Sequence, residues 1–558
     1  MRSDGKYTIG LDFGSLSARG ILADVRDGSI LAEASCEYAH GVLDTFLPDE
    51  TKLEENMCLQ DIDDFTGALE SIIVELVSKG GISSDRIVGI GIDTTASTIL
   101  PVDENFIPLC KKSAFSSRPH AWMKMWKHHA SAEQAERLTE VCRESNKTYL
   151  ERYGGKISPE CLTAKVTEVF EKDREVYEEA AAFIEVADYL TSLLAGKPVF
   201  SASIACAKAM YTMGKGYPDD AFFTAFNKEL KNLPEKLMEH YPNRTLVFPG
   251  EKAGELSSEM AEKLGLRPGI AISAGQMDAY SPMLALGIAR EAAMMMIVGT
   301  STGIMLLSSE PKNVEGITAC LPDTYYKGFW GYASGQASVG DGFGWFAKNC
   351  VPESYAVLAR EKRMDLQRLL TEKASTLEPG ESGVIALDWI NGNKSRLANS
   401  RLSGMFLGIN LTTKPEHLYR ALLEATAFGA RKIKEAYDEA GVPVTEIYVC
   451  GGIPGKNPLM MQIYADVLGL PIKVSRCTQA PALGSAVYAA AAAGAETGYR
   501  DVFEAVENMY DRVYICYTPD EKHREAYEKL YGEYVLLHDY FGRGGNSIME
   551  RLYGMRKK

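Results

Sequence analysis

The chain has 558 residues, 46% of them apolar and 24% charged, so it is long enough for two or more domains with buried cores. Its formal net charge of −15 argues against nucleic acid or an anionic membrane surface as partners. Its 11 cysteines include no C-x-x-C pair, and no apolar stretch reaches the roughly 18 residues of a membrane span, which excludes an obvious zinc site, disulfide framework or membrane anchor.

The first element is predicted over residues 7–23, as an apolar strand, a turn of small residues and a second strand. Gly14 would let the backbone approach a bound group, and Ser15 and Ser17 offer hydroxyls, so this turn could surround a phosphate. Asp12, just before the turn, could hold Mg²⁺ directly or through water. An ordinary β-hairpin whose aspartate caps its own turn would explain the same residues.

A third strand is predicted at 29–33 and a helix over 59–79, where apolar residues have helical spacing. A buried strand then ends at Asp93, followed by a small-residue loop that includes Ala96 and by a return strand. Loops at the carboxyl ends of strands bind ligands in α/β proteins. A plain strand, loop and strand accounts for these residues equally well.

Residues 122–129 are dense in aromatic and basic side chains, which is more typical of a surface helix with one buried aromatic than of a site. A mainly helical stretch is predicted over 160–194. Lys208 then stands alone among small apolar residues, where its ammonium needs either solvent or a partner. Turn residues follow, and we place a domain boundary near residue 268.

The second predicted domain opens with a short strand that ends shortly before Asp278. Residues 293–307 then repeat the first hairpin pattern, with apolar strands on both sides of a turn of small residues. That turn consists of Gly299, Thr300, Ser301 and Thr302. Two such hairpins, far apart in the sequence, suggest two related half-domains that grip one nucleotide, each with a phosphate loop on its side of a cleft.

The Gly- and Ser-rich stretch at 330–346 is expected to be an active-site loop that enters a helix, or else a flexible linker. A long helix is predicted over 415–440, with Gly441 as its C-terminal cap. Beyond about residue 500 the sequence suggests helical packing and offers no motif.

Between these regions, residues 446–474 predict a strand, a loop, a helix and a strand. Gly451 and Gly452 follow the first strand, and paired glycines let a flat adenine ring lie against the backbone. Asn457 before Pro458 is a good N-cap for the helix.

The motifs I-G-L-D-F-G-S, G-I-G-I-D-T-T-A-S-T, M-W-K-H-H, M-D (Met277 and Asp278), V-G-T-S-T-G, A-L-L-E-A-T-A-F-G-A-R and C-G-G-I-P-G-K-N-P occur in this order. Together they resemble the FGGY family of carbohydrate kinases, over residues 9 to about 492. The resemblance implies an α/β fold with two actin-like (ribonuclease H-like) ATPase domains and an interdomain cleft. Residues 1–267 would form the sugar-binding domain with the first phosphate loop, 268–500 the nucleotide-binding domain and 501–558 a C-terminal helical extension.

The resemblance also implies an enzyme that transfers a phosphoryl group from ATP, with Mg²⁺, to the terminal hydroxyl of a ketopentose. We expect a cytoplasmic enzyme whose partners are the sugar and ATP, with neither nucleic acid nor membrane involved and a homodimer as one option. The motifs D-T-T-A-S-T, W-K-H-H, R-Y-G-G-K-I and L-D-W-I-N-G-N are most similar to those of family members that act on L-ribulose.

One residue departs from that subgroup. Ala333 stands where its members carry a glutamate that contacts the sugar, so another ketose or a polyol, such as xylulose or erythrulose, stays open. Gln276, Tyr280 or Ser334 could take over the contact.

The resemblance further implies a role for each matching residue. Asp278 resembles the general base that takes a proton from the sugar hydroxyl, and Asp12 resembles the Mg²⁺ partner, with Asp278 beside it. The phosphate-loop residues would be Gly14, Ser15, Ser17, Gly299, Thr300, Ser301 and Thr302. The adenosine side would be Gly451, Gly452 and Asn457. The sugar pocket would be lined by Ala96, Trp126, Lys208 and Asp278.

Two other classes of protein stay open. A non-catalytic actin-like sugar sensor would be favoured if Asp12 or Asp278 were missing, and both are present. A chaperone-like ATPase of the same fold would need an appended peptide-binding β domain, which the sequence does not indicate.

Overall fold

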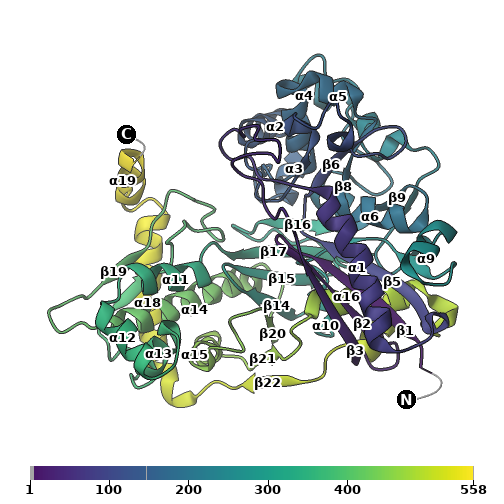
Figure 1. The fold of residues 1–558 in the computed structure, drawn as a ribbon. Coiled ribbons are helices and arrows are strands. Elements are labelled where there is room, and N and C mark those ends of the chain that lie inside the picture. Colours follow the sequence, from purple (N-terminus) through teal and green to yellow (C-terminus); the bar gives the residue numbers. More distant parts are fainter. Residues whose placement is uncertain (1–4, 146, 557–558) are drawn as a thin grey trace. The chain divides into compact units, whose positions relative to one another are not determined.

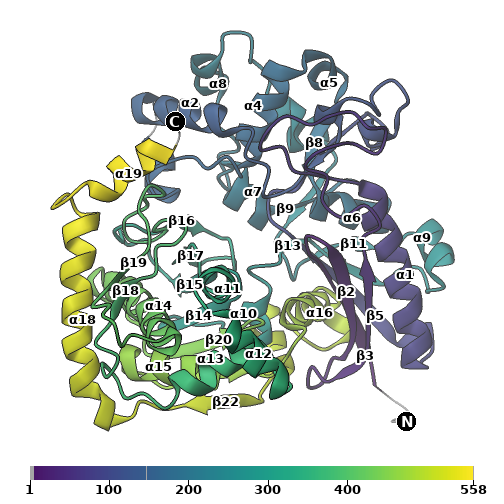
Figure 2. The same cartoon turned by 60° about the vertical axis from the view of Figure 1, so that its left-hand side comes forward.

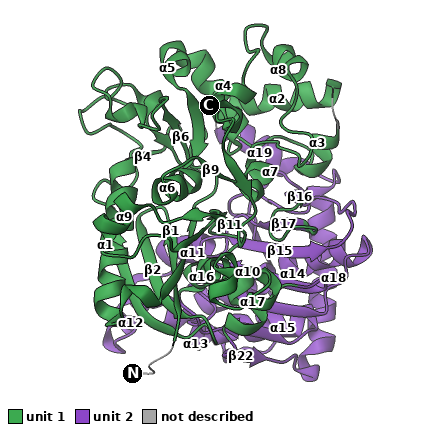
Figure 3. Ribbon diagram, turned by 90° about the vertical axis from the view of Figure 1, so that its right-hand side faces the viewer, with its two compact units in different colours: residues 1–289, 321–330, 479–511 green, residues 290–320, 331–478, 512–558 purple. Residues whose placement is uncertain are grey.

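The computed structural model describes residues 5–145 and 147–556 (Figure 1) and consists of two compact units (Figure 3). Unit 1 takes in residues 1–289, 321–330 and 479–511, and unit 2 takes in 290–320, 331–478 and 512–558. The domains predicted from the sequence, 1–267, 268–500 and 501–558, were defined by their expected functions, and these limits stay a prediction. Within the described residues, no helix is long and apolar enough to cross a membrane.

The first predicted hairpin forms the middle of the main sheet of unit 1. β1 (Tyr7–Phe13) pairs antiparallel with β2 (Ser17–Asp24) and parallel with β5 (Ile87–Thr94). The predicted hairpin and the predicted buried strand ending near Asp93 are therefore confirmed. In sheet order the strands are β11 (Lys252–Glu255), β12 (Ala271–Ser273), β5, β1, β2 and β3 (Ile30–Glu37), with β13 (Gln276–Met277) also paired to β5.

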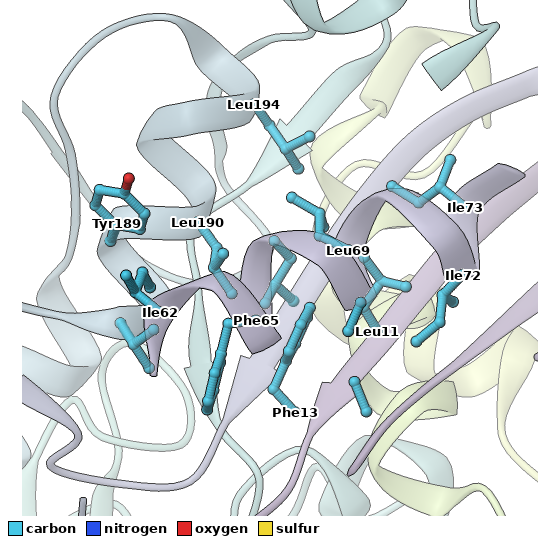
Figure 4. Close-up of a cluster of buried hydrophobic side chains, with 14 of the residues drawn as sticks. Leu11, Phe13, Ile62, Phe65, Leu69, Ile72, Ile73, Tyr189, Leu190 and Leu194 are labelled. Carbon is cyan, nitrogen blue, oxygen red and sulfur yellow. The ribbon is translucent and has the colours of Figure 1, made fainter. Parts of the chain in front are cut away.

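Helix α1 (Ile62–Gly80) covers one face of this sheet by packing on β2 and β3, and it confirms the helix predicted there. Its Asp61 N-cap accepts a hydrogen bond from the Asp63 N–H, and the helix ends at the left-handed Gly81. The odd-numbered side chains of β1 point toward α1, and the rings of Phe13 and Phe65 stack with centroids 5.7 Å apart. Figure 4 shows this apolar core between helix and sheet.

Helix α16 (Ala480–Ala492) packs on strands β1 and β5. It contacts the even-numbered residues of β1 and the odd-numbered residues of β5, and in each strand a glycine lies at the contact. A Cβ on Gly10 would lie 1.9 Å from the Ala482 carbonyl oxygen, and one on Gly91 would lie 2.1 Å from the Ser485 carbonyl oxygen. Only glycine permits this separation, so the helix and sheet backbones are in direct contact.

The rest of unit 1 consists of small sheets and mostly short helices (Figure 1). One small sheet has the order β4 (Leu59–Gln60), β7 (Met123–Lys124), β6 (Ile99–Val102) and β8 (Ala182–Glu185), and another pairs β9 (Val199–Ser201) with β10 (Thr245–Val247). The helices are α2 (Ala132–Ser145), α3 (Lys147–Arg152), α4 (Leu162–Lys172), α5 (Arg174–Glu179), α6 (Val186–Ala195), α7 (Ala202–Lys208), α8 (Asp220–Phe226), α9 (Ser258–Leu264), α10 (Pro282–Ala285) and α17 (Val502–Met509).

The prediction of a surface helix around residues 122–129 is wrong. The segment forms the two-residue strand β7 and irregular chain, and Lys124 and His128 are fully buried. The reason is that Lys165 and Glu168 of α4 supply buried polar partners for this segment.

Unit 2 is also built on a sheet with a central hairpin. β14 (Ala293–Val298) pairs antiparallel with β15 (Thr302–Ser308) and parallel with β20 (Glu446–Cys450), which confirms the second predicted hairpin. The remaining strands of that sheet are β16 (Ala319–Pro322) and β17 (Trp330–Gln336) beyond β15, and β21 (Ile472–Ser475) and β22 (Tyr514–Tyr517) beyond β20. A separate pair is β18 (Ile385–Leu387) with β19 (Met405–Leu407).

Two expectations about unit 2 need correction. Residues 330–336 are the sheet strand β17 rather than a loop, although a helix does follow, as expected. The region beyond residue 500 contains β22, which extends the sheet antiparallel to β21, in addition to helices. Pairing with neighbouring strands decides both cases, and the local composition does not show it.

The predicted long helix is confirmed as α14 (Pro415–Glu439), and Gly441 follows it in the left-handed region with φ of 78°. α18 (Glu521–Gly542) runs beside α14, α15 and β18 (Figure 2). The other helices of unit 2 are α11 (Gly340–Asn349), α12 (Glu353–Glu361), α13 (Leu366–Ala374), α15 (Pro458–Leu468) and α19 (Ile548–Arg556).

Candidate active site

Three carboxyl groups of unit 1 gather where strands β1, β5 and β13 end. The strand register places Asp12 beside Asp93 and Asp93 beside Gln276, and Asp278 follows two residues later. The Asp278 N–H donates to the Thr94 carbonyl oxygen at 2.9 Å, which ties the third carboxyl to the end of β5. The carboxyl ends of parallel strands meet at one edge of a sheet, where α/β proteins bind ligands.

Strand alternation explains why Asp12 and Asp93 point the same way. Each lies two residues beyond a glycine that contacts α16, namely Gly10 and Gly91, so each continues the face toward that helix. Ser485 of α16 donates its hydroxyl to Asp93 Oδ2 at 2.6 Å. The sequence analysis did not assign Asp93 to the site, although the repeated pattern I-G-L-D and I-G-I-D was a signal for it.

Burial raises the pKa values of all three carboxyl groups. Burial, with the Asp12 charge adding to it, raises the pKa of Asp278 to about 7, although a backbone N–H and Lys208 lower it. Burial and then Asp12 raise the pKa of Asp93 well above its usual range. Burial raises the pKa of Asp12, and Asp93 and Arg19 oppose this shift. A carboxyl with a pKa near neutrality is suited to accept a proton from a substrate hydroxyl.

The same cluster suits a magnesium ion, which keeps several water ligands, better than a metal ion that is coordinated by protein ligands alone. Asp93 Oδ1 is buried, and among the described residues it has no hydrogen-bond partner. No group of three or more His, Cys, Asp and Glu within the described chain forms a complete metal site. Mg²⁺ takes few protein carboxylates and keeps several waters, so Asp12 and Asp278 could hold it without further protein ligands.

The first predicted phosphate turn is joined to a predicted sugar-pocket residue. The Gly14 N–H donates to the Ser17 carbonyl oxygen at 3.0 Å and closes the turn. Trp126 Nε1 donates to Ser15 Oγ at 3.0 Å, and Gln60 Nε2 donates to the Ser15 carbonyl oxygen at 2.9 Å. The Ser15 hydroxyl therefore keeps its own proton to donate to a ligand, and its position is coupled to the indole of Trp126.

Ala96 and Lys208 have different supports. Ala96 is the half-exposed residue of an otherwise buried loop between β5 and β6. Lys208 ends α7, and its Nζ lies 3.4 Å from Glu160 Oε2. Burial lowers the pKa of Lys208, but Glu160, Tyr280 and Cys161 together outweigh burial, so the net pKa is raised and the ammonium stays charged. The expectation that this lysine needs a partner or solvent is confirmed, and the sequence analysis missed Glu160.

Two of the residues suggested as substitutes for the absent glutamate have polar groups that are engaged elsewhere. Gln276 is fully buried, its Oε1 accepts from Ser203 Oγ at 2.9 Å, and its Nε2 donates to a backbone carbonyl at 3.2 Å. Ser334 is buried in unit 2, where its hydroxyl is 3.0 Å from the hydroxyl of Tyr437. The polar groups of both residues already have protein partners, and for Gln276, Ser334 and Tyr280 alike the contact with the sugar stays a prediction.

The second predicted phosphate turn lies against the first residues of α11. The Gly299 N–H donates to the Ser301 carbonyl oxygen at 2.9 Å, and the Gly340 N–H donates to the Gly299 carbonyl oxygen at 3.0 Å. Thr300 and Ser301 are exposed. Thr302 Oγ1 is buried and has no partner among the described residues. Free hydroxyls on a tight glycine turn are the donors that a phosphate needs.

The predicted adenosine-side glycines adjoin this turn within unit 2. Gly451 has φ of 110°, and a Cβ there would lie 2.3 Å from the Val298 carbonyl oxygen. Gly452 is exposed. Asn457 Oδ1 accepts from the Met460 N–H at 3.0 Å, which confirms the predicted N-cap, while a ligand contact by Asn457 stays a prediction.

Behind the sugar-pocket segment lies a buried charged cluster that the sequence did not reveal. Glu168 Oε2 is 2.8 Å from His128 Nε2 and 3.4 Å from Lys124 Nζ, and Lys124 Nζ is 3.1 Å from His120 Nδ1. Burial raises the pKa of Glu168, but Lys124 and His128 outweigh it and lower the pKa to about 2. Burial and Lys124 lower the pKa of His120 to about 3 and that of His128 to about 4.

We expect this cluster to make unit 1 sensitive to acid. In the unfolded chain, the pKa of histidine is about 6.5 and that of glutamate is about 4.3. In the folded protein, His120, His128 and Glu168 bind a proton only at lower pH than this. The unfolded chain therefore binds more protons through this window, and stability falls as the pH falls. This contribution alone should lower the melting temperature by on the order of 5 °C from pH 7 to pH 5. Asp278 and Glu185 act in the opposite direction over the same window, because burial raises their pKa values to about 7, so the effect of the cluster is measured by calorimetry, by comparing variants with the wild type.

Two variants make this prediction specific. His120→Gln should shift the pH dependence of the melting temperature toward greater stability at pH 5, because one of the buried histidines is gone. His129→Gln, at an exposed neighbour, should leave it unchanged. A His120→Gln protein with the same pH dependence as the wild type would contradict the assignment.

Comparison with protein families identifies the chain. The N-terminal domain model of the FGGY family of carbohydrate kinases matches residues 7–285, and the C-terminal domain model matches residues 294–493. The chain belongs to the FGGY family of carbohydrate kinases. This FGGY kinase is therefore an ATP-dependent enzyme that phosphorylates a carbohydrate, and its fold is the actin-like ATPase fold in two domains.

Named relatives match the kinase along nearly its whole length. It is 44% identical over 553 residues to a ribulokinase of Halalkalibacterium halodurans, covering 99% of this chain and 98% of the relative. It is 42% identical over 555 residues to a ribulokinase of Shouchella clausii, with the same two coverages.

Solved structures support the same fold. A xylulose kinase of Rhodospirillum rubrum superposes with a TM-score of 0.76 at 22% identity, covering 96% of this chain and 98% of that one. A ligand-bound xylulose kinase of Lactobacillus acidophilus gives 0.77 at 18% identity, with coverages of 97% and 99%.

Proposed function

We propose that the chain is a ribulokinase, which transfers the γ-phosphoryl group of ATP to the terminal hydroxyl of L-ribulose. The likeness to ribulokinases over nearly the full length supports the choice of sugar. The observation that carries the chemistry is Asp278, a half-buried carboxyl with a pKa near 7 beside Asp12. We propose a cytoplasmic location as well, and light scattering of the purified protein tests whether it is a homodimer, the option that the sequence left open.

In this proposal unit 1 binds the sugar and removes its proton. Asp278 accepts the proton of the attacking hydroxyl, and Lys208, held by Glu160, donates to a sugar oxygen. Ala96 and Trp126 line the same pocket. Asp12 and Asp278 would hold Mg²⁺, which neutralises phosphate charge when it is bound.

Unit 2, in this proposal, binds the nucleotide. The backbone N–H groups and hydroxyls of the turn from Gly299 to Thr302 donate to phosphate oxygens. In unit 1, Gly14, Ser15 and Ser17 form the other proposed phosphate turn. Gly451 and Gly452 accept the adenine ring against their backbone, and Asn457 fixes the loop between them and α15. Little covalent chemistry is required of the protein, because phosphoryl transfer depends mainly on positioning and charge neutralisation.

A substrate panel tests the proposal. ADP release is measured with L-ribulose, D-ribulose, D-xylulose, L-erythrulose and ribitol, each with MgATP. We expect the highest kcat/KM with L-ribulose. A more than tenfold preference for another member would reject L-ribulose and would favour the alternative that Ala333 suggests, a kinase for a different ketose or polyol.

We expect Asp12→Asn and Thr300→Val to weaken the use of MgATP and to leave sugar binding nearly intact. The first change removes a charge that orients Mg²⁺, and the second removes one donor to a phosphate oxygen. The KM for MgATP should rise by roughly tenfold, because a hydrogen bond to a charged group contributes about 1.5–3 kcal/mol. Calorimetry with the sugar alone should match the wild type. Loss of the sugar signal would mean that these residues serve the fold or the sugar pocket.

A further inference from the structure

Lys165 of α4 is a fully buried lysine for which the proposed reaction has no use. Its Nζ donates to the Ser97 carbonyl oxygen at 2.5 Å and to the Met125 carbonyl oxygen at 2.8 Å. Burying an ammonium is costly unless hydrogen bonds replace its water. A leucine or methionine would fill the same space at lower cost, so the charge itself requires an explanation.

The two carbonyl groups belong to the two segments that carry proposed sugar-pocket residues. Ser97 directly follows Ala96, in the loop between β5 and β6, and Met125 directly precedes Trp126. These segments are about thirty residues apart in the chain, and one ammonium group is hydrogen-bonded to both. The indole of Trp126 in turn donates to Ser15 Oγ at 3.0 Å, so a shift of this segment would also reach the phosphate turn.

The Ala96 loop depends on outside support. Ser97 has φ of 53°, in the left-handed region that serine rarely adopts, and its buried hydroxyl has no partner among the described residues. Such a conformation persists only where surrounding contacts impose it. The bond from Lys165 to the Ser97 carbonyl oxygen is a contact of that kind, and the hydrogen bond between the Thr95 and Thr98 hydroxyls, at 3.0 Å, is another.

The buried carboxyl of Glu185 attracts the ammonium of Lys165, although burial raises the pKa of Glu185 to about 7. Glu185 ends β8, is 4% exposed, and has an Oε1 without a partner among the described residues. Burial lowers the pKa of Lys165 to about 8, and the Glu185 charge opposes that shift. Glu185 pairs in register with Ile99, immediately beyond the Ala96 loop, so the counter-charge lies next to the same loop.

We propose that Lys165 is a positioning residue of the sugar pocket, which fixes the Ala96 loop and the Trp126 segment relative to each other without touching the sugar. The proposal rests on the proposed function, in which those two segments bind the sugar. Misplacement of a binding group by about 1 Å can cost about a hundredfold in rate, so a sidewise shift of either segment should be visible in the sugar kinetics.

Three variants separate positioning from simple stability. Lys165→Met keeps the volume and removes the donors, but it also removes one of the two positive charges, Lys165 and Lys208, that act on the buried Glu185. The double variant Lys165→Met with Glu185→Gln removes both charges and still lacks the donors. Glu185→Gln alone is the matched control, because it removes a buried charge from the same place and keeps both carbonyl contacts. Each variant is assayed with the best sugar of the wild-type panel.

We expect the KM for the sugar to rise by about tenfold or more in both variants that lack Lys165, since two charge-assisted hydrogen bonds are lost. The KM for MgATP should stay within about twofold, and Glu185→Gln should stay within about threefold for both substrates. A general loss of stability would instead lower the active fraction and leave both KM values unchanged.

The proposal is overturned if the double variant folds with a wild-type KM for the sugar, or if Glu185→Gln reproduces the effect. Hydrogen exchange on the wild type covers the case in which neither lysine variant folds. Sugar should then protect the amides of residues 94–98 and 122–129 together, and protection of neither segment rejects the proposal. If the wild type prefers another sugar, only the assignment of L-ribulose as substrate is refuted. The Lys165 proposal is still tested, because the variants are assayed with the sugar that the wild type prefers.

Discussion

Asp278→Asn is expected to lower kcat for sugar phosphorylation by about 10²–10⁴-fold, the range of a general-base contribution. The amide preserves the shape and can still hydrogen-bond, but it cannot accept the proton of the attacking hydroxyl at neutral pH. In the wild type, burial and the neighbouring Asp12 charge raise the pKa of this carboxyl to about 7, so it is a stronger base than an ordinary aspartate.

Steady-state kinetics and calorimetry with MgATP together check this expectation. The affinity for MgATP should stay within about threefold of the wild type, because Asp12 remains for the magnesium ion. Asp27→Asn, at an exposed turn of the same unit, is the matched control and should keep full activity. If the Asp278 variant keeps more than about a tenth of the wild-type kcat, the assignment of the base fails.

Gly10→Ala should strongly destabilise unit 1. The added Cβ would lie 1.9 Å from the Ala482 carbonyl oxygen and 2.6 Å from the Ala486 backbone nitrogen, so α16 would have to move away from the sheet. Overpacking against backbone, which cannot rotate aside, should cost on the order of 3 kcal/mol. The displacement would also disturb Asp93, because Ser485 of that helix donates to its carboxyl.

Thermal unfolding of Gly10→Ala is compared with that of Gly67→Ala, a control that carries the same chemical change. Gly67 is exposed within α1, and a Cβ there would meet nothing within 4 Å. That variant should be unchanged or stabilised by up to about 1 kcal/mol, since alanine favours a helix. A Gly10→Ala protein that melts within about 2 °C of the wild type would show that α16 can adjust, and the close contact would not be essential.

Much of the fold was predictable because its signals are local. The two hairpins combine apolar strands with a turn of small residues, and both β1–β2 and β14–β15 form as predicted. The helix at 415–439 follows from apolar spacing and the glycine that stops it. The stretch at 330–336 misled the sequence analysis because its glycines and serines are typical of a loop, whereas β17 is a strand of the unit 2 sheet.

The candidate site was predictable only in part, for a related reason. Asp12 and Asp278 lie within family motifs, but the partners that decide their chemistry come from elsewhere in the chain. Asp93 joins them through strand register, and Ser485 reaches it from a helix near the other end of the sequence. The segment at 122–129 looked solvent-exposed because it is rich in basic residues, and Glu168, the partner of its buried Lys124 and His128, follows some forty residues later.

The sequence by itself determined the family, the two glycine-rich turns and the identity of the proposed base, because each depends on residues adjacent in the chain. Only the tertiary structure decided that Asp93 shares the carboxyl cluster, that Glu160 keeps Lys208 charged and that Lys165 joins two separate loops. A buried charge is stable only beside groups that replace its water. Those groups are brought together by folding, and local patterns do not reveal them.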